Sequence, residues 1–498
     1  MSRLTRNSLI VASFFLLDKV LAFVRTGIVS RIYSDEVHLL DTFNAANNLP
    51  DLLFALISGG ALGMAFIPLL TEYLTTKDRA AAWDLFSRVA NVGFLVTGGI
   101  AIIIAIFAQQ IVDANLGIAP GFGAEQRKLL AELMRLNLIG TIIFSISGLV
   151  MASLHANQHF VLPALAPSMY NIGQILGAIF LVPRFGIQGL VYGVILGALF
   201  HLLIQVPGLF MYGFHWTPAL NLRHTGLIEA VKLMAPRLAT MAGIQIIFLA
   251  RDNLASRLDQ VGAVTSLTYG WMIMQVPETI LGTAIATAML PALSELASRK
   301  DWAGFSASIE RALRVLISLT LPIAAVMAAG IHPLVRGAFG FDEQISTLIT
   351  WTTRAYLATL AGYTVHEIAI RAFYARKEPL IPLYAIGIRL VIFLTIGIVG
   401  VTYFKSIGAP IIAFAEIALT VEAVFILSWL SKRTHEPLKT NNAVLKGFVA
   451  AGIGGAVTYF IAVYLPGGAI VTALIGMMAG GVIALAIVWS EAKTILKL

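Results

Sequence analysis

Four polar side chains recur at helical spacing at the start of a long apolar segment, DTFNAANNLPDLLFALISGGALGMAFIPLLTE (residues 41–72). They are Asp41, Asn44, Asn48 and Asp51. On one continuous α-helix these side chains fall within an arc of about 80°. Hydrocarbon does not accommodate carboxylates and amides, so the arc is expected to face a protein interior or a water-filled cavity and to contact a polar substrate there. For Asp41 the alternative is a helix N-cap at the membrane interface.

The first apolar helix adds cationic side chains to this chemistry. Asp18 and Arg25 lie within about 20° of each other on one helical face, and Lys19 is adjacent. Cationic side chains make charge-assisted contacts to phosphate, so Lys19 and Arg25 are expected to bind the phosphate of a substrate. Asp18, Asp41 and Asp51 would hold these cations in position. The alternative is a permanent ion pair between Arg25 and Asp51 that only joins two helices.

A second set of charged residues lies in apolar segments near the end of the chain: Arg389, Glu416 and Glu422. Counted along uninterrupted helices, Arg389 and Glu422 lie at matching depth and are expected to pair. Glu416 is left without an evident partner. A lone carboxylate in a membrane is suited to carry a proton, so Glu416 is a candidate for ion coupling. A purely structural, hydrogen-bonded Glu416 is the alternative.

The composition defines the class of protein that holds these residues. Hydrophobic residues make up 58% and charged residues 12% of the 498 residues, and the mean hydropathy is +0.86. These values are typical of an all-α polytopic membrane protein and exclude a soluble domain. Apolar runs long enough to cross a membrane predict fourteen transmembrane helices. They lie near residues 8–32, 44–70, 87–111, 130–154, 161–182, 187–210, 227–250, 264–293, 312–331, 347–370, 380–403, 408–430, 443–465 and 468–490.

Basic residues concentrate in the loops that alternating helices place on the same side as the N-terminus. This bias predicts cytoplasmic N- and C-termini. The net charge of +8 is explained by the same bias, so nucleic-acid binding is not expected. The chain contains no cysteine, which excludes disulfides and thiolate chemistry. His155 and His159 lack a third metal ligand nearby, and no phosphate-binding loop of an ATPase is present. We therefore expect no metal, no cofactor and no enzymatic activity.

An internal repeat predicts the organisation of the helices. The segment SGGALGMAFIPLLTEYL (58–74) recurs as LGTAIATAMLPALSELA (281–297), and SLHANQHFVLP (153–163) recurs as AFYARKEPLIP (372–382). Six helices separate equivalent elements, so the repeats are expected to be parallel and pseudo-symmetric. The repeat predicts an N-lobe at residues 1–215 with helices 1–6, a C-lobe at 216–435 with helices 7–12, and an appended pair at 436–498.

Several stretches of the chain resemble the MurJ/MviN family of lipid II flippases, in the multidrug/oligosaccharidyl-lipid/polysaccharide exporter superfamily. They are KVLAFVRTGIVSRIY (19–33), DTFNAANNLPDLL (41–53), GGALGMAFIPLLTEY (59–73), NQHFVLPALAPSMYNIGQI (157–175), QVPETILGTAIATAMLPALSE (275–295) and FYARKEPLIP (373–382). The resemblance implies a two-lobed transporter with a central cavity. It also implies movement of the undecaprenyl-linked peptidoglycan precursor across the bacterial cytoplasmic (inner) membrane by alternating access, in support of cell wall biogenesis and cell shape.

The family resemblance also bears on individual residues. Arg25 and Asp41 match charged positions of the family, and Lys19 keeps the charge of a family arginine. Phe54 and Met272 stand where the family commonly carries arginine. The family further implies a groove for the polyprenyl tail, which we assign to the appended helices with their small residues Gly452, Gly454 and Gly455.

Two other functions stay open at this stage. One is ion-coupled export of another polyprenyl-linked glycan or of drugs, and the other is a membrane glycosyltransferase or polymerase. The expected partners are an undecaprenyl-pyrophosphate-linked substrate, membrane lipid and a proton or sodium ion for coupling. Nothing in the sequence indicates which oligomeric state the protein has.

Overall fold

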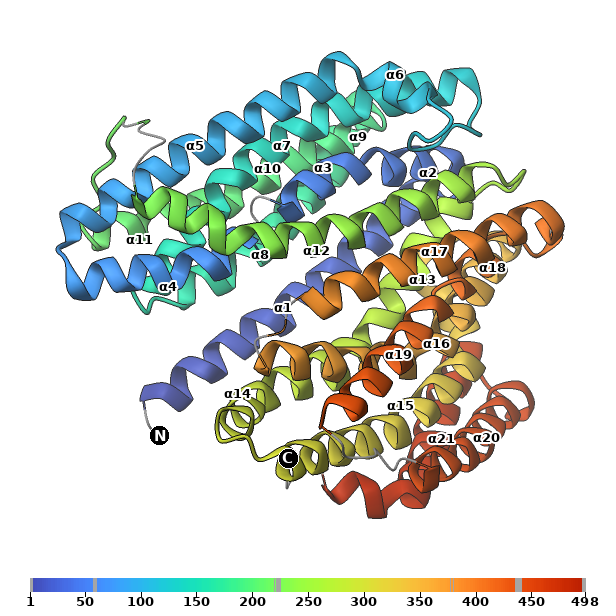
Figure 1. Ribbon diagram of the computed structural model, residues 1–498. Coiled ribbons are helices and arrows are strands. Elements are labelled where there is room, and N and C mark those ends of the chain that lie inside the picture. The colour runs from blue at the N-terminus through green and yellow to red at the C-terminus, as the bar shows by residue number, and fades with distance from the viewer. Residues whose placement is uncertain are drawn as a thin grey trace. The chain divides into compact units, whose positions relative to one another are not determined.

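The computed structural model describes residues 3–56, 61–218, 220, 225–376, 378, 380–434 and 441–494. Within these residues every regular element is helical and no strand occurs. The helices form two units, at residues 1–253 and 254–498, which we call the N-terminal and C-terminal units. Figure 1 shows their helices by label.

Among the described residues, the helices α1 to α11, one π-helix and most of α12 form the N-terminal unit. They are α1 (Arg3–Ile32), α2 (Val37–Ala46), α3 (Asn48–Phe54), α4 (Ala61–Thr76), α5 (Arg79–Ile106), α6 (Ala108–Asp113), α7 (Ala124–Ala156), α8 (Val161–Leu176), the π-helix η2 (Gly177–Leu181), α9 (Val182–Phe185), α10 (Gln188–Leu203), α11 (Val206–Met211) and most of α12 (Thr225–Ser256).

The C-terminal unit contains the remaining helices. They are α13 (Ala263–Glu278), the π-helix η3 (Thr279–Thr283), α14 (Ala284–Ser298), α15 (Trp302–Phe339), α16 (Glu343–Ala375), α17 (Leu380–Tyr403), the 3₁₀ turn η4 (Lys405–Ile407), α18 (Ala409–Phe414), α19 (Ile417–Thr434), α20 (Asn441–Tyr464) and α21 (Ala469–Ala492).

Each apolar run of the sequence falls on one helix or on a chain of consecutive helices. Ten helical stretches in the described residues are long and apolar enough to cross a membrane. The side chains of α5 show the environment of such a helix, because Ile102 and Ile103 expose 59% and 58% of their surface. Neighbouring apolar side chains exposed at this level are expected to face lipid rather than water. The prediction of a polytopic helical membrane protein is confirmed, whereas the count of fourteen crossings stays a prediction.

A π-type segment lies near the start of each copy of the internal repeat. Residues 55–56 have π-type geometry after α3, and η3 has it between α13 and α14. A π-type turn adds a residue to the helical turn and redirects the side chains that follow it. The repeat in the sequence therefore corresponds to a repeated local geometry.

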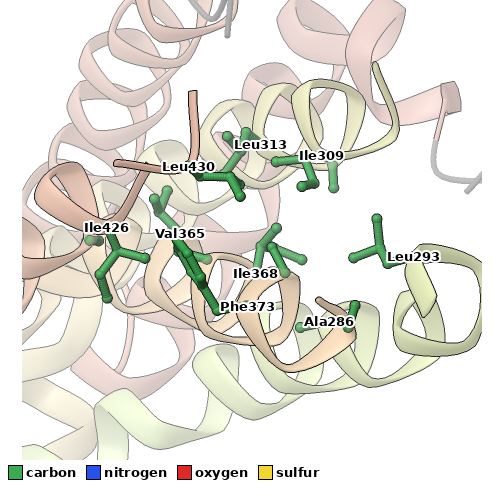
Figure 2. Close-up of a cluster of buried hydrophobic side chains, with 14 of the residues drawn as sticks. Ala286, Leu293, Ile309, Leu313, Val365, Ile368, Phe373, Ile426 and Leu430 are labelled. Carbon is green, nitrogen blue, oxygen red and sulfur yellow. The ribbon is translucent and has the colours of Figure 1, made fainter. Parts of the chain in front are cut away.

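Each unit has its own apolar core. In the C-terminal unit, Phe373 of α16 lies among side chains of α14, α15 and α19, including Leu293, Ile309 and Leu430 (Figure 2). In the N-terminal unit a corresponding cluster joins α4, α5 and α7. Burial of these side chains at the helix contacts fixes the helices of each unit against one another.

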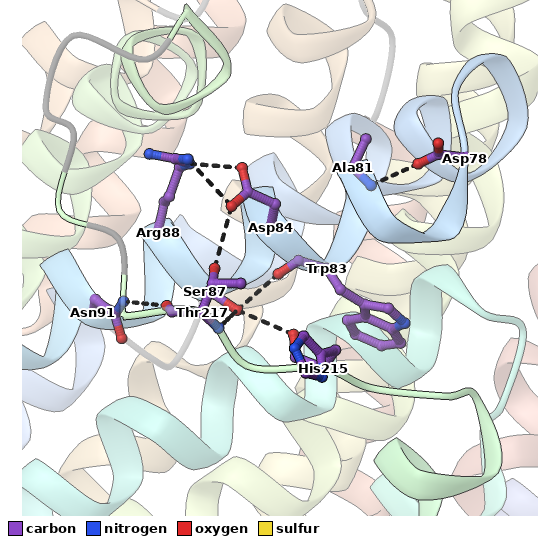
Figure 3. A network of polar contacts seen from close by, with 9 residues as sticks. All are labelled: Asp78, Ala81, Trp83, Asp84, Ser87, Arg88, Asn91, His215 and Thr217. Carbon is purple, nitrogen blue, oxygen red and sulfur yellow. Dashed lines mark hydrogen bonds and ion pairs between the residues drawn. The ribbon is translucent and has the colours of Figure 1, made fainter.

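Polar contacts hold the segment before α12 against α5 (Figure 3). The Thr217 hydroxyl donates to Asp84 Oδ1 at 3.2 Å, and the Thr217 backbone N–H donates to Ser87 Oγ at 3.1 Å. Asn91 Nδ2 donates to the Thr217 carbonyl oxygen at 2.9 Å. Asp84 also accepts from Arg88 Nε at 2.7 Å. This connection between successive helices is therefore fixed at three consecutive turns of α5.

Candidate functional site

The predicted polar helix is interrupted at Asn47, where α2 ends and α3 begins. Pro50 has no backbone N–H and cannot bond to the carbonyl oxygen of Ala46, which ends the regular hydrogen-bond pattern there. The Asn47 side chain is fixed by its Oδ1, which accepts from Asn137 Nδ2 of α7 at 2.9 Å. One continuous helix through residues 44–70 was therefore a wrong prediction. Asp41 and Asn44 lie on α2, and Asn48 and Asp51 lie on α3.

The polar residues of α2 and α3 have different surroundings. Asp41 is 3% exposed and Asn44 is half-buried. Asn48 Nδ2 donates to Asp252 Oδ2 of α12 at 2.8 Å. Asp51 is instead exposed, with no hydrogen bond or ion pair to its carboxylate among the described residues. The four side chains thus divide into three buried or half-buried groups and one accessible carboxylate.

The partner of Asn48 was not predicted from the sequence. Asp252 is 1% exposed and also accepts from Arg251 Nε at 2.7 Å. The apolar run predicted that this helix ends at residue 250, whereas α12 continues to Ser256. An adjacent arginine and aspartate at the end of an apolar run were the available signal, because such a pair can extend a helix while satisfying its own charges.

The predicted residues of α1 are also distinguished by their contacts. Asp18 Oδ1 accepts from Asn171 Nδ2 of α8 at 2.8 Å, and Asn171 is 4% exposed. Lys19 is exposed and Arg25 is half-buried. Neither cation makes an ion pair within 4.0 Å in the part of the chain that the structure describes. Both cations therefore keep their donors for another group.

A permanent pair of Arg25 with Asp51, the alternative to a role in substrate binding, does not occur among the described residues. Arg25, Arg251 and Asp252 nevertheless all act electrostatically on the Asp51 carboxylate. Two cations and two carboxylates on α1, α3 and α12 thus influence one another inside the N-terminal unit. An arrangement of this kind positions the charge of Arg25 without occupying its guanidinium group.

In the C-terminal unit the predicted pairing of Arg389 with Glu422 is wrong. Arg389 Nη2 of α17 lies 2.7 Å from Glu416 Oε2, and the Tyr363 hydroxyl of α16 donates to the same oxygen at 2.8 Å. Glu416 lies in the turn between α18 and α19, so depths counted along one uninterrupted helix misplaced it. Arg389 is 4% and Glu416 is 1% exposed, so both charges are buried as a pair.

Glu422 pairs with a histidine that the sequence analysis missed. His366 Nε2 of α16 lies 3.3 Å from Glu422 Oε2, and the side chains are 9% and 0% exposed. Neither Glu422 oxygen has a hydrogen-bond partner among the described residues. Spacing gave no signal for this pair, because His366 and Glu422 belong to helices far apart in the sequence.

The three glycines of α20 face different surroundings. A Cβ on Gly452 would meet nothing within 4 Å, and one on Gly455 would make ordinary contacts with Ala325 of α15. A Cβ on Gly454 would lie 2.9 Å from Ala484 Cβ and from the Gly480 carbonyl oxygen of α21. Gly454 therefore allows two helices to pack closely, whereas Gly452 leaves space open on the helix surface.

Known proteins resemble this chain over most of its length. The family described as Lipid II flippase MurJ matches residues 37–486. A lipid II flippase MurJ of Burkholderia cenocepacia is 29% identical over 425 residues, which cover 82% of this chain and 81% of the relative. A probable lipid II flippase MurJ of Haemophilus influenzae is 26% identical over 473 residues, 90% of each chain.

Solved structures share the fold. A lipid II flippase MurJ in an inward closed conformation matches with a TM-score of 0.81 and 19% identity, over 98% of this chain and 100% of that one. An inward-facing multidrug resistance transporter of the MATE family matches with a TM-score of 0.70 and 14% identity, over 83% of this chain and 95% of that one. At these identities the likeness establishes the fold.

Proposed function

Because the chain belongs to the lipid II flippase MurJ family, we propose that it moves lipid II from the inner to the outer leaflet of the bacterial cytoplasmic membrane by alternating access. It acts as a multi-pass transporter and not as an enzyme. The observation that carries the proposal is the pair of cations on α1, Lys19 and Arg25, which make no ion pair among the described residues. Unpaired cations in an apolar helix are costly unless they serve a ligand.

The chemistry of these cations suits a pyrophosphate group. The guanidinium of Arg25 can donate two parallel hydrogen bonds to phosphate oxygens, and Lys19 adds a point charge. Asp18 is held by Asn171, and Asp51 shares the electrostatic environment of Arg25. We propose that Asp41, Asn44 and Asn48 complete the polar surroundings of the substrate path.

Depletion of the protein in its host tests the function. Lipid II is expected to accumulate in the inner leaflet, and cells are expected to lose their shape and lyse. Accumulation of a different polyprenyl-linked glycan, with normal lipid II turnover, would instead support the alternative export function. Accumulation of neither intermediate would contradict both of these functions.

The topology proposed for this function has both termini in the cytoplasm. The distribution of basic residues in the loops supports it. Two lobes at residues 1–215 and 216–435, with an appended pair at 436–498, would then alternate access to the two leaflets. The repeated π-type turns support equivalent roles for the two lobes.

For coupling we propose that protons bind at His366 and Glu422. The side chains are buried, and both Glu422 oxygens lack a hydrogen-bond partner among the described residues. Arg389, Tyr363 and Glu416 are the other titratable groups of this cluster, and these three hydrogen-bond with one another. Glu416 is held by Arg389 and Tyr363, so we assign the coupling role to Glu422, which is buried beside His366 without such contacts.

Replacing Glu422 with glutamine is therefore expected to remove the response of transport to a pH difference. In vesicles, the wild-type flipping rate should change when the pH difference is reversed, and the Glu422→Gln rate should not. Glu343→Gln, an exposed carboxylate of the same unit, is the matched control and should keep the response. A retained response in Glu422→Gln would remove this pair from coupling and leave membrane potential or a sodium ion as the driving force.

For the polyprenyl tail we propose a groove on the surface of α20 near Gly452. Gly452→Leu is expected to slow transport of long-chain substrates more than transport of short-chain analogues, because the space at this position is open. Gly454→Leu is the matched comparison. It should slow both equally by separating α20 from α21. Equal loss for both chain lengths in Gly452→Leu would argue against a tail at this position.

A further inference from the structure

Polar contacts join the last turns of α15 to the first turns of α16 in the C-terminal unit. Near the connection, Glu343 of α16 lies 3.1 Å from His332 Nε2 and 3.0 Å from Arg336 Nη1 of α15. About three turns further along α16, Arg354 Nε donates to the Ala328 carbonyl oxygen of α15 at 2.8 Å. The described residues place no carboxylate within 4.0 Å of Arg354. Glu343 is therefore balanced by α15, whereas no described residue balances the charge of Arg354.

The guanidinium of Arg354 is held in a fixed orientation. Its Nε is bonded to the Ala328 carbonyl oxygen, and its Cζ lies 4.7 Å from the centre of the Trp351 ring. Its two terminal nitrogens, Nη1 and Nη2, make no hydrogen bond to the described residues. The parallel N–H groups of a guanidinium match two oxygens of a phosphate or carboxylate. Arg354 is therefore oriented to bind an oxyanion.

The surroundings of Arg354 face lipid at the level of the headgroups. Trp351 is 55% exposed, and Tyr459 of α20, which acts electrostatically on Arg354, is 50% exposed. Tryptophan and tyrosine side chains concentrate where a membrane meets water. Ala328 lies near the end of the apolar run predicted at residues 312–331, about 5 Å from it along the helix. A lipid headgroup can therefore reach Arg354.

The charge of Arg354 calls for an anion from the membrane. An arginine that faces lipid is costly unless an anion accompanies it, and phosphate is the anion that lipid headgroups carry at this depth. The Tyr459 hydroxyl can donate a further hydrogen bond to the same group. We propose that Arg354, Trp351 and Tyr459 bind the phosphate group of a lipid headgroup. In the topology proposed above, this lipid belongs to the outer leaflet.

The proposed site is separate from the cations of α1, so it does not depend on transport of lipid II. Native mass spectrometry of the detergent-solubilised full-length protein tests it by counting tightly bound lipids. Phosphatidylglycerol is the ligand, and diacylglycerol with the same chains but no phosphate is the control. Arg354→Met is expected to weaken the binding of one phosphatidylglycerol molecule at least about tenfold, because charge-assisted hydrogen bonds are lost. Binding of diacylglycerol should not change.

Undecaprenyl phosphate distinguishes the two sources of a lipid phosphate. Binding of phosphatidylglycerol that depends on Arg354 identifies a common membrane lipid as the ligand. Binding of undecaprenyl phosphate alone, again dependent on Arg354, identifies the polyprenyl carrier instead. Either result supports a phosphate site at Arg354.

Matched variants keep the test specific. Arg336→Met removes a cation from the same end of α15 that is already paired with Glu343, and it should bind phosphatidylglycerol as the wild type does. Trp351→Leu removes the exposed ring and should weaken this binding, which tests the site without changing a charge. Thermal unfolding identifies a variant that fails to fold. The proposal is overturned if Arg354→Met binds both phosphate lipids normally, or if Arg336→Met loses as much binding as Arg354→Met.

Discussion

An Arg25→Ala variant is expected to insert and fold normally and to lose flipping activity. Arg25 makes no ion pair within 4.0 Å among the described residues, so its removal breaks no structural pair. Two parallel hydrogen bonds to a phosphate group would be lost, which corresponds to a decrease in rate of about a hundredfold or more. Arg25→Lys keeps the charge but not the paired donors and should recover part of the rate. Accessibility of lipid II in the outer leaflet measures the effect.

Arg184→Ala is the matched control, because Arg184 is an exposed arginine of the same unit. This variant should flip at the wild-type rate. The exchange Arg25→Asp with Asp51→Arg provides a second check. It should not restore activity, since the two side chains form no direct pair within the described residues. Full activity of Arg25→Ala, or rescue by the exchange, would show that Arg25 only supports the structure.

The second large effect is a loss of stability when Arg389 is replaced. Replacing Arg389 with methionine keeps the length of the side chain but leaves Glu416 buried at 1% exposure without its cation. Removing one partner of a buried ion pair costs about 3–5 kcal/mol. The free energy of unfolding in detergent is expected to fall by this amount.

The double variant Arg389→Met/Glu416→Leu should recover most of the stability, because no buried charge is left alone. Arg336→Met provides a control for the loss of an exposed partner. Arg336 pairs with Glu343 at 3.0 Å, but the side chains are 63% and 59% exposed. Such a pair contributes about 1 kcal/mol or less. Equal losses in Arg389→Met and Arg336→Met would contradict the interpretation of Arg389 and Glu416 as a buried ion pair.

Much of the fold follows from apolar runs, because a membrane requires each crossing to satisfy its backbone within a helix. The run predicted at residues 380–403 coincides with α17. The run at 41–72 did not form one helix, because Pro50 ends the hydrogen-bond pattern of α2 and a π-type turn follows at residues 55–56. The length and hydropathy of an apolar run do not reveal such interruptions of the helix.

The candidate site was predictable to a smaller extent. Charged residues within apolar runs identified Arg25, Asp51 and Arg389, because buried charges in a membrane are rarely without a role. Their partners depend on contacts between distant helices. His366 contacts Glu422, which is 56 residues away in the sequence, and Asp252 contacts Asn48, which is 204 residues away. The pairing of Arg389 with Glu416 was missed because the turn after α18 shifts the depth of Glu416.

The central claim is that this chain moves lipid II through contacts of its α1 cations with the pyrophosphate. The direct measurement is made in vesicles that contain the purified protein and lipid II labelled on its headgroup. An impermeant reagent added outside reports the lipid II that has crossed. The account predicts rapid crossing with the wild type, slow crossing with Arg25→Ala and no crossing of phosphatidylcholine with either. Equal crossing with wild-type and Arg25→Ala protein, or no crossing of lipid II at all, would contradict it.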